Sequence, residues 1–417
     1  MQPNDGRPSD GRPSGDRPWD VIVLGGGIVG ACAARSLAVG NAAEHRAARS
    51  VLLLDAFEAG HTRGSSHGDG RIVRFTYPEQ TYLDMAKSAF PAWADIERES
   101  GVRLIETTGG FECGPAGSPE ILELREGMGA AGIPFERLDA DEARRRFPHF
   151  AVDDDHEILF QDSGAIVRAD LAVGTLWDLV QDAGAQVAAG CRAEQIEVGH
   201  DGEGPLITVS GRRQGGEGFR FAARALVVAA GGWSRELLRP LGLDLPLQVS
   251  REVVAYFPTR RSTTVDHGVA SMPTLIDYDG EDIFYALPQI DVPGVKIGWH
   301  HAGPETDPDE IGELDGKVLQ GIVAYAERRF PHLDPDPAKV LTCLYTNTPD
   351  YHFVIDRHPE IPQIVIGTGF SGHGFKFGPV SGELLADLAS GIEPTLDLDL
   401  FRIARFSSSN LARRTNA

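Results

Sequence analysis

The sequence predicts an α/β fold into which a second unit, built on an antiparallel sheet, is inserted. Three observations lead to this prediction. A strand, a glycine-rich turn, a helix and a second strand follow one another over residues 20–55, which is the pattern of a β-α-β unit. Apolar and polar residues alternate over residues 245–300, as in antiparallel strands with one solvated face. The α/β pattern then returns with "QIVIGT" and a final helical segment.

Composition sets the broad class of the protein. The chain has 417 residues, 41% of them hydrophobic and 24% charged, so it is long enough for two domains with a sizeable core. A formal net charge of −22 argues against nucleic acid and against anionic membrane surfaces as partners. An acidic protein that binds an anionic substrate needs a local cationic pocket, so basic residues inside motifs carry weight.

The cysteines and the N-terminus indicate the compartment. Cys32, Cys113, Cys191 and Cys343 are widely spaced and form no CxxC pair, so neither a metal site nor a disulfide framework is predicted. A reducing compartment fits this pattern. Because the sequence contains no secretory signal and no apolar run of membrane-spanning length, we expect a cytoplasmic protein.

The elements follow in order along the chain. Residues 1–18 repeat "DGRPS" and are expected to be a disordered tail. The first strand covers 20–24, a helix runs from Ile28 to Val39, and the second strand ends at Asp55. Further helices are expected at residues 80–100, 118–131, 139–146, 168–187, in "KVLQGIVAYAERRFP" and after residue 377, and a buried strand ending in glycines at 225–233.

The turn "VIVLGGGIVG" predicts a dinucleotide site. Gly25, Gly27 and Gly30 have the GxGxxG spacing, which allows a tight turn, close approach of backbone to pyrophosphate, and helix–strand packing, with the helix N-terminus at Ile28 facing the phosphates. Asp55 ends the second strand, where an acid binds a free ribose hydroxyl, so FAD or NAD is favoured over NADP. The alternative is a glycine-rich turn without a ligand. The second glycine element, at Gly231, favours FAD.

Five further segments carry a family resemblance. They are "HTRGSSHGDGRIVRFTY", "FYALPQIDVPGVKIGWH", "TCLYTNTPDYHFVIDRHP", "GFSGHGFKFGP" and "LFRIARF". With them the chain resembles the monomeric sarcosine oxidase and N-methyltryptophan oxidase family of FAD-dependent amine oxidases over nearly all of residues 20–406. The resemblance implies a glutathione-reductase-like FAD-binding domain at 19–95, 157–235 and 335–417, and an antiparallel catalytic domain at 96–156 and 236–334.

The resemblance also implies an activity. The family uses O2 to oxidise secondary amine amino acids such as sarcosine to an imine, which is hydrolysed to an amino acid and formaldehyde, with H2O2 as the second product. We therefore expect a monomeric enzyme whose partners are an amino acid and O2, with hydride transfer from carbon to the flavin. Alternatives are an oxidase of a cyclic or bulky secondary amine acid, such as a pipecolate-like one, a flavin dehydrogenase with another acceptor, and a non-catalytic flavin- or NAD-binding protein.

Individual roles follow from the matched positions. Cys343 matches the cysteine bonded covalently to the flavin 8α-methyl; the alternative is a buried small hydrophobe. Lys296 matches the cation that assists O2 reduction; otherwise it is the solvent-side member of a strand. His300 and Tyr285 match residues that face the substrate, although such residues are usually structural.

Basic residues and glycines complete the predicted site. Arg74 and Lys376 match the pair that binds the substrate carboxylate, whereas the alternative for Arg74 is a surface ion pair. The remaining matches are the flavin-facing basic residues His67 and Arg71 and, in the late glycine loop, Gly372, His373 and Gly374. The sequence departs from the family at two positions: Gly70 stands where a threonine is expected, and Ser66 where a second histidine is common. The missing hydroxyl would alter hydrogen bonding or make room.

Overall fold

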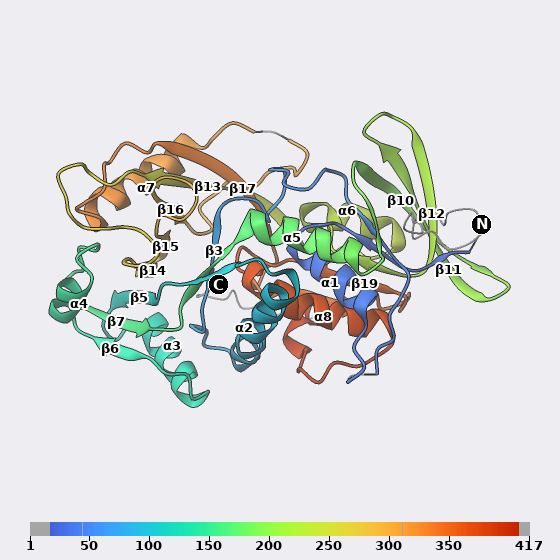
Figure 1. The fold of residues 1–417 in the computed structure, drawn as a ribbon, viewed down its shortest axis with the longest axis horizontal. Coiled ribbons are helices and arrows are strands. Elements are labelled where there is room, and N and C mark those ends of the chain that lie inside the picture. Colours follow the sequence, from blue (N-terminus) through green and yellow to red (C-terminus); the bar gives the residue numbers. More distant parts are fainter. Residues whose placement is uncertain (1–16, 44, 311, 408–417) are drawn as a thin grey trace, which may run out of the picture.

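The computed structural model describes residues 17–43, 45–310 and 312–407. The expected tail at residues 1–18 lies outside the described residues except for its last two positions. Two lobes lie side by side, and the chain passes between them several times (Figure 1). No helix in the described ranges is long and apolar enough to cross a membrane.

The first sheet is built on five parallel strands in the order β9-β2-β1-β12-β19. β18 pairs antiparallel with β19, while β10 and β11 form an antiparallel ribbon with the first half of β12. The eight strands are β1 (Trp19–Leu24), β2 (Val51–Leu54), β9 (Gln186–Ala188), β10 (Cys191–Asp201), β11 (Gly204–Arg213), β12 (Gly218–Val228), β18 (Val354–Arg357) and β19 (Ile364–Thr368). The sequence pattern does not predict the ribbon, because β10 has few buried apolar residues and carries many charges.

The parallel strands are buried on both faces. Along β1, Val21 and Val23 belong to the apolar cluster beneath the helices, whereas Ile22 and Leu24 belong to the cluster on the opposite face. A strand with apolar neighbours on both sides reads as a continuous apolar run rather than an alternating one. The continuous apolar runs "VIVL" and "VLLL" therefore predict buried core strands.

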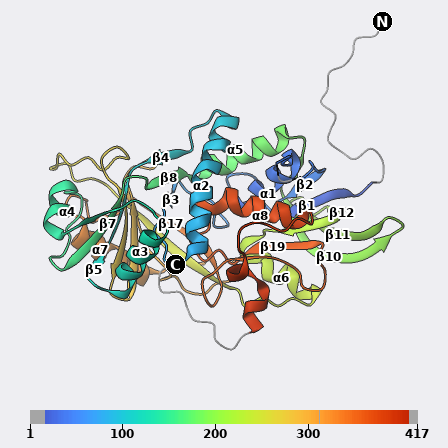
Figure 2. The same cartoon turned by 90° about the horizontal axis from the view of Figure 1, so that it is seen from below.

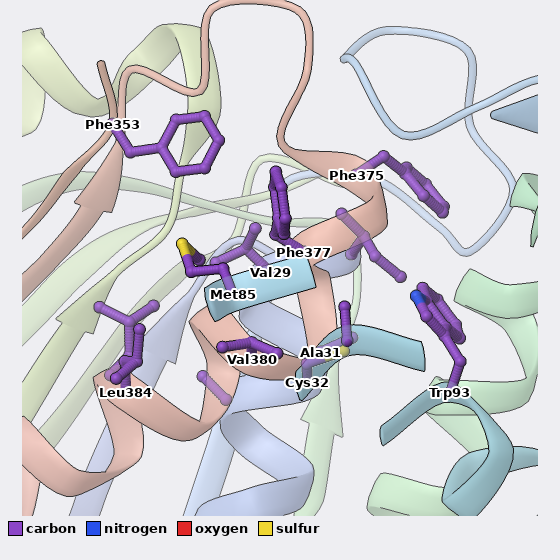
Figure 3. Close-up of a cluster of buried hydrophobic side chains, with 14 of the residues drawn as sticks. Val29, Ala31, Cys32, Met85, Trp93, Phe353, Phe375, Phe377, Val380 and Leu384 are labelled. Carbon is purple, nitrogen blue, oxygen red and sulfur yellow. The ribbon is translucent and has the colours of Figure 1, made fainter. Parts of the chain in front are cut away.

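Helices cover one face of this sheet. They are α1 (Ile28–Val39), α2 (Gln80–Ser100), α5 (Ala169–Asp182) and α8 (Gly378–Ala389), with the short α6 (Ser234–Leu238) on the other side. α1 and α8 are in close contact: a Cβ on Gly382 would lie 2.5 Å from Cβ of Cys32. Cys32 is therefore a small buried side chain between two helices, in the same cluster as Met85 and Val380 (Figure 3).

The second sheet runs in the order β17-β13-β16-β15-β14-β5-β7-β6, and only the β14–β5 pair is parallel. Its strands are β5 (Gly110–Pro115), β6 (Glu136–Leu138), β7 (His156–Gln161), β13 (Gln248–Phe257), β14 (Thr274–Asp279), β15 (Asp282–Leu287), β16 (Val295–Trp299) and β17 (Lys339–Asn347). The helices of this lobe are α3 (Pro119–Ala130), α4 (Ala140–Arg146) and α7 (Gly316–Arg329). The structure thus confirms the expected antiparallel strands.

The expectation of one solvated face on these strands is wrong. Ala255 and Ile297, on β13 and β16, pack with Ile322 of α7 in the core of the lobe. The opposite face carries Tyr256 and Lys296, which are 1% and 4% exposed. The polar positions of the alternating pattern are therefore buried as well, because they line a cavity instead of the outer surface.

A small third sheet lies between the lobes. It has the order β3-β8-β4, with β3 (Gly70–Val73), β8 (Ala165–Arg168) and β4 (Ile105–Thr107). β3 and β17 lie between the two lobes in both views (Figure 1 and Figure 2). Short 3₁₀ helices complete the described fold: η1 (Gly231–Trp233), η2 (Arg239–Leu241), η3 (Phe375–Phe377), η4 (Asp399–Phe401) and η5 (Ile403–Ser407).

Two strands belong to a different sheet from the one that the expected segment boundaries imply. β7 and β17 hydrogen-bond within the second sheet, although they fall in the segments 157–235 and 335–417 that the sequence assigned to the cofactor domain. We propose the division into a cofactor unit and a substrate unit with these two strands counted in the latter.

Candidate active site

A cavity of about 560 Å³ lies where the two lobes meet β3 and β17. It extends from the glycine turn after β1 to the late glycine loop before η3. Every predicted site residue except Gly30 lines it: Gly25, Gly27, Ile28, Asp55, His67, Arg71, Arg74, Gly231, Tyr285, Lys296, His300, Cys343, Gly372, His373, Gly374 and Lys376. Tertiary structure thus brings together residues from seven separate segments of the chain.

The glycine turn has the geometry that its spacing predicts. Gly25 has φ +99°, a conformation that glycine tolerates and other residues rarely adopt. A Cβ on Gly30 would lie 1.8 Å from the carbonyl oxygen of Gly25, so this glycine packs the helix against the turn, behind the cavity wall. Gly27 lies on the wall, and the amide of Ile28 donates to Oγ of Ser66 at 3.1 Å.

Asp55 lies at the end of β2, beside this turn. Its Oδ2 accepts a hydrogen bond from the amide of Gly26 at 2.5 Å, and its Oδ1 accepts one from the amide of Phe57 at 2.8 Å. Burial raises the pKa of Asp55, and the two amides oppose that effect. Trp177 of α5, which the sequence analysis missed, donates from Nε1 to the carbonyl of Gly26 at 2.7 Å.

Two cations that line the cavity share one carbonyl. Nη1 of Arg71 and Nζ of Lys296 donate to the carbonyl oxygen of Gly70 at 2.9 and 3.0 Å. Burial, followed by the repulsion of Arg71, lowers the pKa of Lys296 to about 8. Burial also lowers the pKa of His67 to about 4, with Arg71 and Lys296 as further causes. The predicted basic residues therefore form one cluster.

Gly70 provides no additional space beside this cluster. A Cβ there would lie 2.9 Å from Cγ2 of Ile166 and 3.0 Å from Cδ2 of Leu287. Side chains of the neighbouring strands thus fill the volume that a threonine would occupy. The consequence of glycine at this position is closer packing.

Cys343 lies on β17, directly opposite Glu252 of β13. Directly opposed residues of an antiparallel pair project to the same side. Burial raises the pKa of the Cys343 thiol, whereas Arg71 and Lys296 lower it. The other three cysteines are buried and free, and burial raises the pKa of Cys32 to about 12.

The side chains of two tyrosines lie so close to the backbone that the residues facing them must be glycine. A Cβ on Gly298 would lie 2.4 Å from the hydroxyl of Tyr285, its cross-strand neighbour. A Cβ on Gly372 would lie 2.3 Å from the ring of Tyr345. Glycine 372 therefore allows the late loop to approach a side chain of β17. Tyr345, whose hydroxyl is hydrogen-bonded to Nδ1 of His300 at 3.1 Å, was not predicted from the sequence.

Arg74 and Lys376 both lie close to one aromatic ring. The guanidinium carbon of Arg74 is 4.9 Å from the centroid of Tyr77, and Nζ of Lys376 is 5.3 Å from it. Nζ of Lys376 also donates to the hydroxyl of Tyr77 and to the carbonyl of His373, both at 2.7 Å. The two predicted carboxylate-binding residues, separated by some 300 positions, are thus neighbours.

Arg74 has a buried counter-ion. Its Nη1 lies 3.3 Å from Oε2 of Glu112, and Thr76 donates to the other oxygen of that carboxylate at 2.7 Å. Glu112 is 1% exposed and Arg74 is 5% exposed. The surface ion pair considered for Arg74 is therefore replaced by a buried one. Glu112 sits on a strand between apolar residues, and nothing in the sequence pattern marks it as a partner of Arg74.

The residues of the cavity fit the predicted cofactor, FAD. In the described part of the chain, Nε2 of His67 and Oγ1 of Thr346 are buried without a hydrogen-bond partner, and both residues line the cavity. Buried polar atoms are normally paired, so unpaired ones on a cavity wall indicate groups that a ligand satisfies. The glycine turn, Asp55 and the cation cluster line the same cavity.

The chain matches the family model described as FAD dependent oxidoreductase over residues 20–388. It is 35% identical to the peroxisomal sarcosine oxidase of Homo sapiens, over 94% of this chain and 97% of that protein. It is 31% identical to the N-methyl-L-tryptophan oxidase of Salmonella arizonae, over 93% and 99% of the two chains. Among solved structures it is similar to NikD, an amino acid oxidase of nikkomycin biosynthesis, with TM-score 0.77 and 24% identity over 92% of this chain and 97% of that one.

These matches confirm the family and the fold class that the sequence predicts. The family model covers most of the chain, and the relatives are matched over nearly their whole length. The structural match to NikD also covers nearly the whole length of both chains. The chain belongs to the FAD dependent oxidoreductase family and is a sarcosine oxidase-like flavoenzyme.

Proposed function

We propose that this flavoenzyme oxidises the CH–NH bond of a secondary amine amino acid, sarcosine or another N-methyl amino acid, with O2 as the electron acceptor. The products are an imine, which water converts to an amino acid and formaldehyde, and H2O2. The observation that carries the proposal is that one cavity joins the dinucleotide turn to the cation pair Arg74 and Lys376. A substrate carboxylate bound by that pair lies in the same enclosure as the cofactor.

Arg74 and Lys376 bind the carboxylate. Their charges are buried around Tyr77, where a charge-assisted hydrogen bond is stronger than in water. Glu112 neutralises part of the charge of Arg74, so the pair presents less than two full positive charges, which suits a single carboxylate.

Ile72, Ile276 and Ile283 line the cavity and offer an apolar surface to the rest of the substrate. This surface favours the second candidate, a cyclic or bulky secondary amine acid, because aliphatic side chains there would bury additional hydrocarbon. The name of the Salmonella arizonae relative, an oxidase of N-methyl-L-tryptophan, is consistent with a large substrate side chain.

FAD, when bound, supplies the electron sink that accepts a hydride equivalent from the carbon next to nitrogen. The turn at Gly25, Gly27 and Ile28 would hold its pyrophosphate, and Asp55 its ribose. Gly231, Gly372, His373 and Gly374 would edge the ring system. His300 and Tyr285 orient the substrate.

The cation cluster has two tasks. Arg71, with His67 beside it, holds positive charge where negative charge accumulates on reduction, and Lys296 keeps an ammonium ready to stabilise the charge that develops on O2. A dehydrogenase that hands electrons to another acceptor has no need for such an ammonium. Cys343 would hold the flavin through a thioether to its 8α carbon. Burial raises the pKa of the Cys343 thiol, and Arg71 and Lys296 offset part of that effect in favour of the nucleophilic thiolate.

We also propose a monomer in the cytoplasm. In the described ranges the exposed large apolar side chains lie apart on different segments, at Val39, Leu171, Val198 and Leu314. Scattered apolar residues of this kind do not form an association surface. The four free cysteines suit a reducing compartment.

Two measurements test the proposal. The purified enzyme is precipitated with acid, and yellow colour that stays with the pellet supports the thioether; the C343S variant should release its flavin into the supernatant. Flavin released from the unmodified protein would refute the covalent bond.

Peroxide release is then measured with sarcosine, N-methyl-L-tryptophan, pipecolate and proline, with the primary amine glycine as control. The ranking of the four separates the small from the bulky substrate class. If no secondary amine acid yields peroxide, the oxidase function is wrong.

A further inference from the structure

Lys296 has an acidic neighbour, Asp69, that is not among the predicted site residues. Nζ of Lys296 lies 3.8 Å from Oδ1 of Asp69, a distance too long for a direct hydrogen bond. The same oxygen accepts a hydrogen bond from the hydroxyl of Tyr256 at 2.7 Å. The three side chains are 4%, 9% and 1% exposed in the order Lys296, Asp69, Tyr256. A buried ammonium and a phenol therefore compete for one carboxylate oxygen.

The backbone fixes both ends of this arrangement. Tyr256 of β13 is directly opposite Lys296 of β16, so the two side chains leave the sheet on the same side. The loop that carries Asp69 is attached to the start of α5: Ala169 donates to the carbonyl of Asp69 at 3.1 Å, and Asp170 donates to the carbonyl of Gly68 at 3.0 Å. The backbone of Asp69 is therefore held in place, so only rotation of its side chain can bring the carboxylate closer to Lys296.

We propose that Asp69 and Tyr256 are positioning residues for Lys296. Asp69 provides the negative charge that keeps Nζ of Lys296 protonated. Tyr256 holds the Asp69 carboxylate through its hydrogen bond to Oδ1. The ammonium therefore keeps its hydrogen bond to the Gly70 carbonyl on the cavity wall instead of forming a direct ion pair with Asp69. The inference rests on the proposed function, since the task of Lys296 at O2 is part of that proposal.

The surrounding charges require such a device. Arg71 of β3 repels the ammonium, and His67 is close enough for Lys296 to lower the pKa of its imidazole. Asp170 of α5 and Cys343 of β17 oppose that repulsion, together with Asp69. On β17, the other strand that pairs with β13, Nζ of Lys339 lies 5.8 Å from the centroid of the Tyr256 ring. The net result is that the pKa of Lys296 is lowered to about 8, close enough to neutrality for small shifts to matter.

The two substitutions have opposite expected effects. Asp69→Asn removes the counter-charge next to a buried ammonium and lowers the titration midpoint of Lys296 by about one pH unit or more, a tenfold loss of proton affinity. Tyr256→Phe keeps the charge and frees Oδ1, so the carboxylate pairs directly with the ammonium and the midpoint rises by about half a unit or more. A purely structural role of either residue predicts no such opposed shifts.

The chain allows a direct measurement. It contains five lysines, Lys87, Lys296, Lys317, Lys339 and Lys376, so the holoenzyme labelled with [ε-¹³C]lysine gives few signals. K296R identifies the signal of Lys296, and the exposed Lys87 and Lys317 serve as internal references during titration from pH 6 to 11. Tyr325→Phe is the matched control, because Tyr325 also donates to a buried carboxylate, Oδ2 of Asp277, at 2.7 Å but lies away from the cavity.

Opposed shifts in D69N and Y256F, with no shift in Y325F, support the proposal. A Lys296 midpoint that stays within about 0.3 units of the unmodified enzyme in Y256F overturns it, and this variant keeps the result decisive if D69N does not fold. The O2 task of Lys296 is tested separately by the rate at which the reduced enzyme reacts with O2. If K296M does not slow that reaction, the proposed task is wrong, while the NMR result still decides the positioning.

Discussion

The carboxylate of Glu112 lies 3.3 Å from Nη1 of Arg74, inside the wall of the cavity and out of contact with solvent. Although burial alone would lower it, the pKa of Arg74 is raised because Glu112 is so close. Burial raises the pKa of Glu112, and Arg74 opposes that effect. The strength of carboxylate binding at Arg74 therefore depends on a residue that a substrate does not reach.

Glu112→Gln should tighten the binding of a carboxylate ligand. The change removes a negative charge behind Arg74 and keeps an oxygen that can accept from Thr76, so the potential at the cavity wall becomes more positive. We expect at least about a threefold lower Kd, equivalent to about 0.7 kcal/mol, for a non-oxidisable acid such as cyclopentanecarboxylate. Titration followed by the visible spectrum of the flavin measures it. The control is Glu142→Gln, which removes the charge of a half-buried carboxylate that pairs with Arg145. Weaker ligand binding in E112Q would contradict the prediction.

Arg74→Ala should raise the Kd of the same carboxylate ligand by about 30- to 150-fold, or about 2–3 kcal/mol, and leave the flavin bound. The variant also leaves Glu112 buried without its partner, which lowers the free energy of unfolding. The double variant R74M/E112Q removes both charges and should recover stability without recovering affinity. Loss of flavin from either variant would instead show that Arg74 supports the cofactor site.

Gly70→Ala should destabilise the folded state by about 1–3 kcal/mol, because its Cβ meets Ile166 and Leu287 at 2.9 and 3.0 Å. Combining it with Ile166→Ala should give a smaller loss than the sum of the two single changes. Gly174→Ala is the matched control: it lies inside α5 with no atom within 4 Å of its Cβ, and the added methyl should stabilise the helix by about 0.5–1 kcal/mol. Urea unfolding measures all four, and additive effects of Gly70 and Ile166 would contradict the packing argument.

His267→Gln should make the protein less sensitive to acid. Burial, followed by the nearby His149, lowers the pKa of His267 to about 4, below the value of about 6.5 expected in the unfolded chain. The unfolded state therefore binds more protons between pH 6.5 and 4, so stability is lost as the pH falls through this window. Between pH 7.5 and 5, the free energy of unfolding should fall by about 1 kcal/mol less in the variant than in the unmodified protein, with solvent screening taken into account.

The control for this prediction is His200→Gln, at an exposed position of β10. The other groups that face His267 are His332, and Asp266, whose pKa is lowered chiefly by its hydrogen bonds to Ser271 and Gly268. Both are unchanged in the variant. An equal acid sensitivity of H267Q and the unmodified protein in urea unfolding would show that His267 does not set it.

Local sequence by itself determined the strand–turn–helix unit at Gly25–Gly30, the buried strands, most helices and the identity of the basic residues. These features depend on neighbours a few positions apart, such as a glycine that permits φ +99° or an apolar run buried on both sides of a sheet. The resemblance in the late glycine loop pointed to Lys376 as a partner of Arg74, and the fold places the two around Tyr77.

Tertiary structure alone decided which acid stands behind each cation. Glu112 of β5 reaches Arg74 across 38 positions, and Tyr256 of β13 reaches Asp69 across 187. It also decided that the polar face of β13 and β16 lines a cavity. The physical reason is that periodicity shows which side chains share a face, whereas register and the crossing of the chain between lobes determine what that face meets.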